Sequence, residues 1–375
     1  MIYRAQETAI RKKLNSGKAI LLLGARQVGK TTLLKKLLES SDYLFLDADD
    51  PTVRALLTAP NTEDIKSILA NHNLVFIDEA QRIPNIGLTL KIITDQFKHV
   101  QLLVSGSSSF DLGNQINEPL TGRKWEFELF PISWEEYERH LGFLKSEQQL
   151  ENRLLYGFYP DVINNPGQEK SILKNLLNSY LYRDLLAFSE IRKPEVLEKL
   201  IQALALQLGS EVNYNEVAHI LGINKITVQN YINILEKGYI VFRLNSFSRN
   251  LRNEIKQNRK IYFYDNGIRN AVIGNFNPLD LRNDKGALWE NFLVSERHKQ
   301  HAYNETFTKM YFWRTRDQQE IDLVEESNGQ IFGYEFKWEK DKANIPARFV
   351  KTYQANTTVV NRKNFREFVV GNNPD

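Results

Sequence analysis

Cysteine, long apolar runs and a large net charge are all missing from this sequence of 375 residues. Without cysteine the chain forms neither disulfides nor thiolate metal sites, which fits a reducing compartment. No apolar run approaches the roughly twenty residues that cross a bilayer, and the charged start MIYRAQETAIRKK lacks the apolar segment of a secretory signal. The net charge is only +3, so any nucleic-acid binding must come from a local patch. We therefore expect a cytoplasmic protein without a membrane segment, long enough for two or three domains.

A glycine-rich segment follows a strongly apolar run near the start of the chain. Residues 24–32 read GARQVGKTT directly after AILLL, which is the pattern G-x-x-x-x-G-K-[ST] at a strand-to-helix junction. Gly24 and Gly29 allow the tight backbone path on which N–H groups converge around phosphate oxygens. Lys30 can reach the terminal phosphates, Thr31 can offer its hydroxyl to Mg²⁺, and a helix over residues 30–39 points its positive end at the anion. The predicted ATP-binding residues are Gly24, Arg26, Gln27, Val28, Gly29, Lys30, Thr31 and Thr32.

Two carboxylates end a second apolar run, LVFIDE at residues 74–79. Such a run is typical of a strand buried on both faces. Phosphoryl transfer needs mainly positioning of the water and neutralisation of developing charge, and adjacent acids at a strand tip suit both tasks. We therefore predict Asp78 as a Mg²⁺ ligand and Glu79 as the residue that polarises the attacking water.

Further apolar runs indicate the rest of this domain. Strands are expected at residues 43–46 and 101–105, and helical patterns separate them. This alternation predicts the α/β fold class, with a parallel sheet. Ser105 and Ser107 lie at and just past the end of the last strand. Their hydroxyls either sense the terminal phosphate, which makes Ser105 a candidate catalytic residue, or form a turn.

Several longer runs are similar to those of one family. They are DEAQRIP (78–84), SGSSSFDL (105–112), EPLTGR (118–123), GFYPDV (157–162), YLYRDLL (180–186) and IYFYDNGIRNAV (261–272). With the phosphate loop they resemble the bacterial and archaeal AAA-superfamily ATPases that carry a C-terminal domain of unknown function, and the likeness covers nearly the whole chain. It implies that Arg123 is an arginine finger acting in trans within a homo-oligomer, and such a finger accelerates hydrolysis roughly a thousandfold or more. The alternative is an arginine that pairs with an acid of its own domain.

Proline and glycine residues punctuate the passage out of the first domain. They are Pro131, Gly157, Pro160, Pro166 and Gly167. We predict three parts: an AAA-type P-loop ATPase domain at 1–140, a helical and winged-helix region at 141–275, and a restriction-endonuclease-like α/β domain at 276–375. The middle part should begin with helical structure over residues 168–208.

A helix-turn-helix is expected in the middle part. NYNEVAHIL (213–221) begins with a capping residue, Gly222 breaks the pattern, and KITVQNYINILE (225–236) resumes it. Strands at 239–244 and 260–264, with residues 248–258 as the tip between them, complete a winged helix, which can place its second helix in the DNA major groove. The candidate DNA contacts are Lys225, Gln229, Asn230, Arg249, Arg252, Lys256, Arg259 and Lys260. The alternative is an interdomain packing unit with a solvated basic hairpin.

Three acids and a lysine recur in a recognisable order in the C-terminal part. Glu290 lies on an expected helix, Asp322 on an expected strand, and Glu335 and Lys337 on the next strand. This order resembles the restriction-endonuclease-like fold with its D…E-x-K signature. Residues two apart on a strand share a face, so Glu335 could bind Mg²⁺ while Lys337 stabilises or activates the attacking water. The predicted metal ligands are thus Glu290, Asp322 and Glu335, and the predicted catalytic pair is Glu335 and Lys337.

Two functions fit these features. The first is a Mg²⁺-dependent ATPase that couples hydrolysis to action on or near nucleic acid, with the C-terminal part as a candidate nuclease. The second is a nucleotide-switched protein-interaction module with an inactive nuclease-like domain. Extra acids at Glu325 and Glu326 could repel DNA. The six histidines form no convincing metal cluster, so no zinc is assigned.

Overall fold

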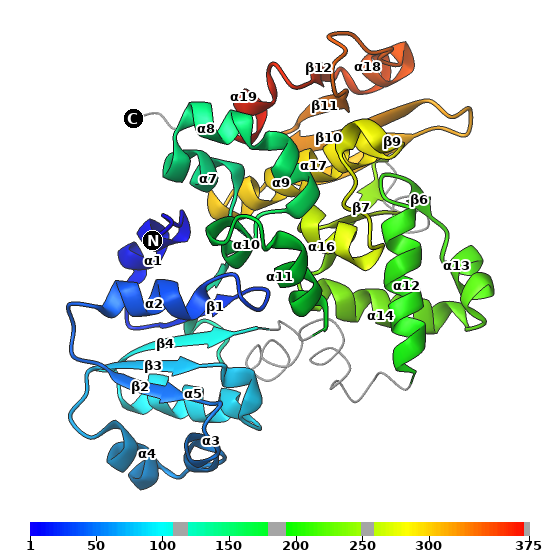
Figure 1. The fold of residues 1–375 in the computed structure, drawn as a ribbon. Coiled ribbons are helices and arrows are strands. Elements are labelled where there is room, and N and C mark those ends of the chain that lie inside the picture. The colour runs from blue at the N-terminus through cyan, green and yellow to red at the C-terminus, as the bar shows by residue number, and fades with distance from the viewer. Residues whose placement is uncertain (108–118, 179–192, 249–258, 371–375) are drawn as a thin grey trace. The chain divides into compact units, whose positions relative to one another are not determined.

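The computed structural model describes residues 1–107, 119–178, 193–248 and 259–370. The contacts between residues define two compact units, and most of their elements are labelled in Figure 1. The first consists of Met1–Pro131 and the short segment Lys237–Tyr239, and the second of Ile132–Glu236 and Ile240–Asp375. The three-part division at residues 140 and 275 stays a prediction, and these contacts group its second and third parts into one unit.

The first unit contains a five-stranded sheet of order β2-β3-β4-β1-β5, in which every pairing is parallel. Its strands are β1 (Ala19–Leu23), β2 (Leu44–Asp47), β3 (Leu74–Asp78), β4 (Gln101–Gly106) and β5 (Lys124–Glu128). The helices described in this unit are α1 (Gln6–Lys13), α2 (Lys30–Leu38), α3 (Pro51–Leu57), α4 (Thr62–Leu69) and α5 (Ile86–Gln96), with a 3-10 turn η1 at Ala80–Arg82. The predicted α/β class with a parallel sheet is confirmed.

The register of these strands brings their carboxyl ends to one edge of the sheet. Leu22 of β1 lies opposite Ser105 of β4, and Ile77 of β3 lies opposite Val104. The phosphate loop follows β1, the acid pair lies at the end of β3, and Ser105 and Ser107 lie at the end of β4, so these groups meet at that edge. β5 lies outside the apolar runs on which the strand predictions of this domain rest, since its residues KWEFE alternate between polar and aromatic, as befits an edge strand.

The second unit contains a seven-stranded mixed sheet of order β12-β11-β10-β9-β7-β8-β6. Its strands are β6 (Glu211–Val212), β7 (Val241–Ser246), β8 (Arg259–Phe263), β9 (Lys309–Arg314), β10 (Glu320–Ser327), β11 (Gln330–Phe336) and β12 (Asn356–Val360). The pairs β7–β9 and β11–β12 are parallel, and the other pairs are antiparallel. Because β7 joins β9, the strands of the predicted winged helix and those of the C-terminal part form one continuous sheet.

The helices described in the second unit fall into two groups along the chain, one before β7 and one after β8. The earlier ones are α7 (Trp134–Leu141), α8 (Phe143–Gln148), α9 (Leu150–Tyr156), α10 (Pro160–Asn164), α11 (Glu169–Leu176), α12 (Pro194–Leu206), α13 (Tyr214–Leu221) and α14 (Lys225–Lys237). The later ones are α16 (Asn266–Val272), η3 (Leu279–Leu281), α17 (Lys285–Tyr303), α18 (Ala347–Tyr353) and α19 (Phe365–Val369). The YLYRDLL run, predicted to be helical, lies outside the described residues.

Two helices stand where the helix-turn-helix is predicted. The Asn213 side chain accepts a hydrogen bond from the N–H of Asn215 (2.9 Å) and so caps the start of α13. Gly222 ends α13 in the left-handed conformation (φ 64°), which glycine adopts without strain, and α14 then begins at Lys225. The hairpin strands β7 and β8 pair antiparallel as expected. The assignment of this region as a winged helix stays a prediction.

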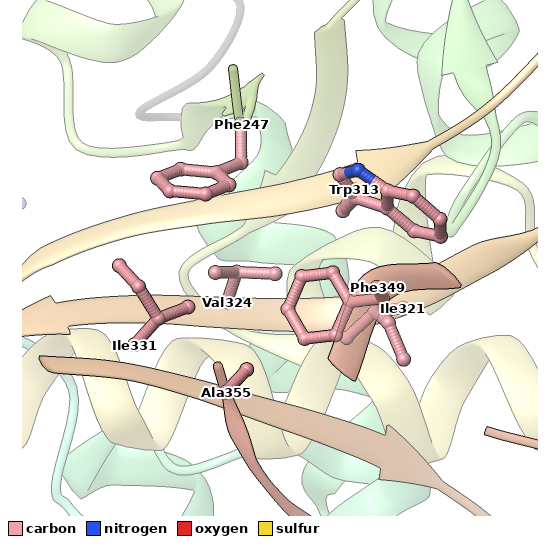
Figure 2. Close-up of a cluster of buried hydrophobic side chains, with 7 residues drawn as sticks. All are labelled: Phe247, Trp313, Ile321, Val324, Ile331, Phe349 and Ala355. Carbon is pink, nitrogen blue, oxygen red and sulfur yellow. The ribbon is translucent and has the colours of Figure 1, made fainter. Parts of the chain in front are cut away.

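A cluster of buried apolar side chains holds α18 against the C-terminal strands (Figure 2). Its members are Phe247, Trp313, Ile321, Val324, Ile331, Phe349 and Ala355. Phe349 of α18 is fully buried, and a Cβ on Gly333 of β11 would stand 2.7 Å from its ring. Glycine at this position therefore lets the helix approach the strand.

A polar contact fixes α17 to β8. The side chain of Asn291 from α17 bonds both the N–H and the carbonyl of Phe263 on β8 (2.8 and 3.0 Å).

The DNGIRNAV run has a structural role in the second unit. The buried carboxylate of Asp265 accepts hydrogen bonds from the N–H groups of Phe158 (2.6 Å) and Ile268 (3.1 Å), so it caps α16 and ties it to the GFYPDV run. The Asn270 side chain donates to the carbonyls of Leu154 (3.3 Å) and Leu155 (2.9 Å). These two family-like runs therefore stabilise one another.

Candidate nucleotide site and a second charged cluster

The phosphate loop connects β1 to α2 with two required glycines. A Cβ on Gly24 would overlap the backbone carbonyl of Leu129, and Gly29 has φ 97°, which residues with a side chain rarely adopt. Gln27 also takes a left-handed conformation (φ 61°). The loop thus turns its backbone toward the start of α2, as the predicted phosphate site requires.

Lys30 is buried at the start of α2. Its ammonium donates to the carbonyls of Gly24 (3.0 Å) and Ala25 (2.8 Å), both within the loop. Burial lowers the pKa of Lys30 to about 8, and the nearby acids Glu79 and Asp78 oppose this shift. The lysine, the loop and the acid pair therefore lie together.

Arg4 supports the loop from the N-terminal segment. Its guanidinium is buried and donates to the carbonyls of Val28 in the loop and Phe130 after β5, each at 2.6 Å. Sequence reasoning did not identify this residue, because its partners are 24 and 126 positions away.

Oxygen ligands suited to Mg²⁺ meet beside α2. The Thr31 hydroxyl donates to the Asp78 carboxylate (3.1 Å), and the buried Ser105 hydroxyl donates to the same carboxylate oxygen. A carboxylate and a hydroxyl fit Mg²⁺, which in nucleotide sites takes most other ligands from phosphate and water. In the described structure Ser105 therefore contacts the predicted metal ligand, and it also accepts the N–H of Glu79 (3.3 Å).

Glu79 is held in a side-chain network that the sequence did not reveal. Its backbone is left-handed (φ 50°), and its Oε2 atom accepts hydrogen bonds from Gln81 (2.5 Å) and the Ser107 hydroxyl (3.2 Å). Gln81 also donates to the Ser107 hydroxyl (2.7 Å) and accepts the Ser107 N–H (3.3 Å). Gln81 lies in the DEAQRIP run, but only the fold shows that it bridges η1 and the segment after β4.

Arg123 lies away from this site in its own unit. It precedes β5, and its carbonyl accepts the N–H of Ala19 at the first residue of β1 (2.9 Å). The phosphate loop follows the other end of β1, roughly 15 Å along the strand. The Arg123 side chain forms an ion pair with Asp95 (2.5 Å), which is the pairing within its own domain that the sequence left open.

A second charged cluster forms in the second unit. The Glu290 Oε1 atom accepts bonds from the Lys260 ammonium (2.9 Å) and the Tyr262 hydroxyl (2.6 Å), and Lys260 also pairs with Glu320 (2.5 Å). Burial raises the pKa of Asp322 well above its ordinary value, and the charges of Glu290 and Glu335 add to this shift.

The predicted catalytic pair belongs to the same cluster. Lys337 pairs with Glu335 (2.7 Å), and the N–H of Phe336, between them, donates to Asp322 (2.8 Å). The fold thus brings Glu290, Asp322, Glu335 and Lys337 together. Yet across residues 1–107, 119–178, 193–248 and 259–370, no group of three or more His, Asp or Glu side chains is arranged to hold a metal ion.

Among the described residues of the predicted basic hairpin, Lys260 differs from expectation. The prediction that Lys260 contacts DNA is wrong, because its side chain is only 1% exposed and faces carboxylates. Arg259 bonds Asn245 (3.3 Å), whereas Arg249, Arg252 and Lys256 lie outside the described residues.

The acids expected to repel DNA are partly neutralised. Glu325 is buried and accepts hydrogen bonds from Arg297 (2.7 and 2.9 Å) and His301 (2.7 Å). Burial alone would raise the pKa of Glu325, but these bonds to His301 and Arg297 lower it to about 2. Its charge therefore stabilises the fold instead of facing solvent.

The first unit has the features of a P-loop ATPase: a parallel sheet, the glycine loop with Lys30 and Thr31, and the acid pair at the end of β3. Comparison with known families agrees, since the family described as "AAA domain" matches residues 16–138. Two families described as domains of unknown function, DUF8612 and DUF4143, match residues 147–279 and 285–373. The chain is thus a P-loop ATPase of the AAA type with a C-terminal DUF4143 domain.

Relatives occur in bacteria and archaea. The uncharacterized protein Rv2008c of Mycobacterium tuberculosis is 28% identical over 332 residues, covering 88% of this chain and 72% of the relative. The uncharacterized protein MJ1544 of Methanocaldococcus jannaschii is 24% identical over 336 residues, covering 83% and 73%. Among solved structures, the Walker-type ATPase PABY2304 of Pyrococcus abyssi aligns with a TM-score of 0.54 at 15% identity, over 73% of this chain and 96% of that chain. This last likeness supports the fold.

Within the described ranges, no helix is long and apolar enough to span a bilayer.

Proposed function

We propose that this ATPase is Mg²⁺-dependent and cytoplasmic, and that its nucleotide state changes how the second unit binds a macromolecular partner. The carrying observation is the contrast between the two charged clusters. In the first unit, Thr31 and Asp78 offer oxygen ligands beside the phosphate loop. In the second, Glu290 and Glu335 are each bonded to a lysine ammonium. This contrast supports hydrolysis in the first unit and an interaction role for the second.

The phosphate site supplies the groups that hydrolysis requires. When ATP binds, the Lys30 ammonium exchanges the carbonyls of Gly24 and Ala25 for phosphate oxygens, and the N-terminus of α2 faces the same anion. Thr31 and Asp78 would hold Mg²⁺, which neutralises charge on the phosphates when bound. Ser105 keeps Asp78 oriented through its hydroxyl, and phosphate sensing by Ser105 stays a prediction.

Glu79 is the proposed residue that polarises the attacking water. Gln81 and Ser107 both donate to its Oε2 atom, so they fix the direction of the carboxylate. A fixed carboxylate can accept a proton from a water aligned with the terminal phosphate. Replacing Glu79 by glutamine should therefore leave ATP bound while slowing its turnover.

Arg123 is the proposed arginine finger for a neighbouring copy. Its place at the opposite end of β1 keeps it from its own phosphate loop. Exposure of about 40% leaves its side chain accessible, and releasing the ion pair to Asp95 would free it. Its action therefore requires a homo-oligomer.

Hydrogen exchange of the full chain tests the proposed switch. In Glu79→Gln, ATP and ADP should give different amide exchange within residues 132–236 or 240–370, since the bound ATP persists. Lys30→Ala should abolish the difference, while Lys35→Ala, an exposed lysine of the same helix, should retain it. Identical exchange in the two nucleotide states, with binding of both confirmed by calorimetry, would exclude a nucleotide-driven change in the second unit.

Action on nucleic acid is the second candidate, and the exposed start of α14 favours it. Lys225 and Asn230 of α14 are exposed. Two apolar side chains are also exposed in this region: Ile220 of α13 (61% exposed) and Ile226 of α14 (67% exposed). DNA affinity that falls steeply with added salt, and that Lys225→Ala weakens, would support phosphate contacts. Affinity for a protein partner that is insensitive to salt and lost in Ile226→Ser would support the interaction role. Cleavage by Glu335 and Lys337 would need a divalent cation in the second cluster.

A further inference from the structure

Lys260 is a buried cation at the centre of the second charged cluster. It lies on β8, its side chain is 1% exposed, and its ammonium stands 2.9 Å from Glu290 Oε1 and 2.5 Å from Glu320 Oε1. Burying an ammonium is costly unless opposite charges compensate it. These two carboxylates come from α17 and β10, so one side chain links three elements of the fold.

The carboxylate of Glu290 is engaged further. The same Oε1 atom that contacts Lys260 accepts the hydroxyl of Tyr262, two residues along β8 (2.6 Å). Lys260 and Tyr262 lie two apart on one strand and therefore face the same side. Strand β8 therefore supplies two hydrogen-bond donors, an ammonium and a hydroxyl, to one oxygen of Glu290.

The other predicted metal ligands each have a donor on one oxygen, although the buried Oε2 atom of Glu335 has no hydrogen-bond partner in the described structure. Glu335 Oε1 accepts the Lys337 ammonium (2.7 Å), and Asp322 Oδ2 accepts the N–H of Phe336 (2.8 Å). Arg314 lies 3.7 Å from Glu320 and adds a further positive charge. A magnesium ion needs several oxygen ligands in near-octahedral positions. With the ammonium groups of Lys260 and Lys337 and the N–H of Phe336 already bonded to their oxygens, these carboxylates do not present such a set.

We propose that Lys260 is a built-in cation that replaces a divalent metal in the cluster of Glu290, Glu320, Asp322 and Glu335. The cluster then clasps the hairpin strand β8 to α17 and β10 and binds no Mg²⁺ while Lys260 is in place. This inference deepens the proposed interaction role of the second unit, since it makes the nuclease-like domain inactive as a metal-dependent nuclease. It does not depend on ATP turnover.

Binding of Mn²⁺, measured by electron paramagnetic resonance in the full chain without nucleotide, tests the proposal. Asp78→Asn removes the metal ligand of the phosphate site and serves as the background for all variants. In this background no Mn²⁺ should bind at the cluster. Adding Lys260→Met should create one Mn²⁺ site, and adding Glu290→Gln to that variant should weaken it at least tenfold. Lys285→Met, which removes a lysine of α17 that pairs with Asp280, should create no site.

Two results would overturn the proposal. One is Mn²⁺ binding in the background chain that Glu290→Gln or Glu335→Gln abolishes, because the cluster would then hold metal with Lys260 present. The other is a folded Lys260→Met variant that gains no Mn²⁺. If circular dichroism shows that this variant does not fold, the background titration alone decides. Loss of the nucleotide-dependent exchange described above would leave this result unchanged, so the two proposals fail separately.

Discussion

The burial of Lys30 predicts that ATP affinity falls as the pH rises through 8. Burial lowers the pKa of Lys30 to about 8, from an ordinary value of 10.5. Only the charged ammonium attracts phosphate oxygens. The charge of the terminal phosphate of ATP changes little above pH 7, because the second pKa of a phosphate monoester is about 6. The pH dependence of binding should therefore follow the protonation of Lys30.

The size of the effect follows from this pKa. Between pH 7 and pH 9 the charged fraction of Lys30 in the free chain falls about tenfold, so the apparent Kd for ATP should rise about tenfold, or ~1.4 kcal/mol. Calorimetric titration with a non-hydrolysable ATP analogue, in half-unit steps from pH 7 to 9.5, measures this change. Lys30→Arg is the matched control, because a guanidinium stays charged throughout. A Kd for the intact chain that is constant over this range would refute the reasoning.

Three further outcomes are expected from other parts of the structure. Gln81→Ala removes one of two donors to Glu79 and should lower kcat about tenfold with an unchanged KM for ATP, because it misdirects the carboxylate without touching the loop; a normal kcat in steady-state assays would contradict this. An Arg123→Ala chain mixed with a Glu79→Gln chain should regain ATPase activity in mixed assemblies if the finger acts in trans, and no regain in confirmed mixed assemblies would count against a shared site. Glu325→Gln should lose about 3 kcal/mol of unfolding free energy at pH 7. Because the folded pKa of Glu325 is depressed to about 2 from 4.5, this difference should shrink as the pH falls from about 4.5 toward 2, as urea denaturation at several pH values can show.

Local patterns allowed much of the first unit to be predicted. The run AILLL followed by GARQVGKTT encodes a buried strand, a glycine turn and a helix within a short segment, and the structure places β1 and α2 there. The strand at LVFID was predicted for the same reason. By contrast, the edge strand β5 carries no apolar run, and its place beside β1 depends on partners about a hundred residues away.

Long-range pairing explains what the sequence did not predict in the candidate sites. Lys260 looks like a surface residue of a basic hairpin, and only the approach of Glu290 and Glu320 shows that it is buried. Arg4 lies in a charged segment with no motif, yet it bonds the loop at Val28. Gln81 sits inside a predicted motif, but its partner Ser107 belongs to another strand end. In each case the role arises from residues that the fold brings together.

Ser105 and Ser107, at the end of β4, show how neighbouring acids acquire separate tasks. Asp78 and Glu79 are adjacent in sequence, but the left-handed backbone at Glu79 (φ 50°) turns its side chain from the path that a continued strand would take. Ser105 then donates to Asp78, whereas Ser107 donates to Glu79. One serine therefore orients the proposed metal ligand and the other the proposed water-polarising carboxylate. Because both hydroxyls are bonded to acids, phosphate sensing by Ser105 would require its bond to Asp78 to break. Ser107 can act on hydrolysis without such a change, through the carboxylate that it already holds.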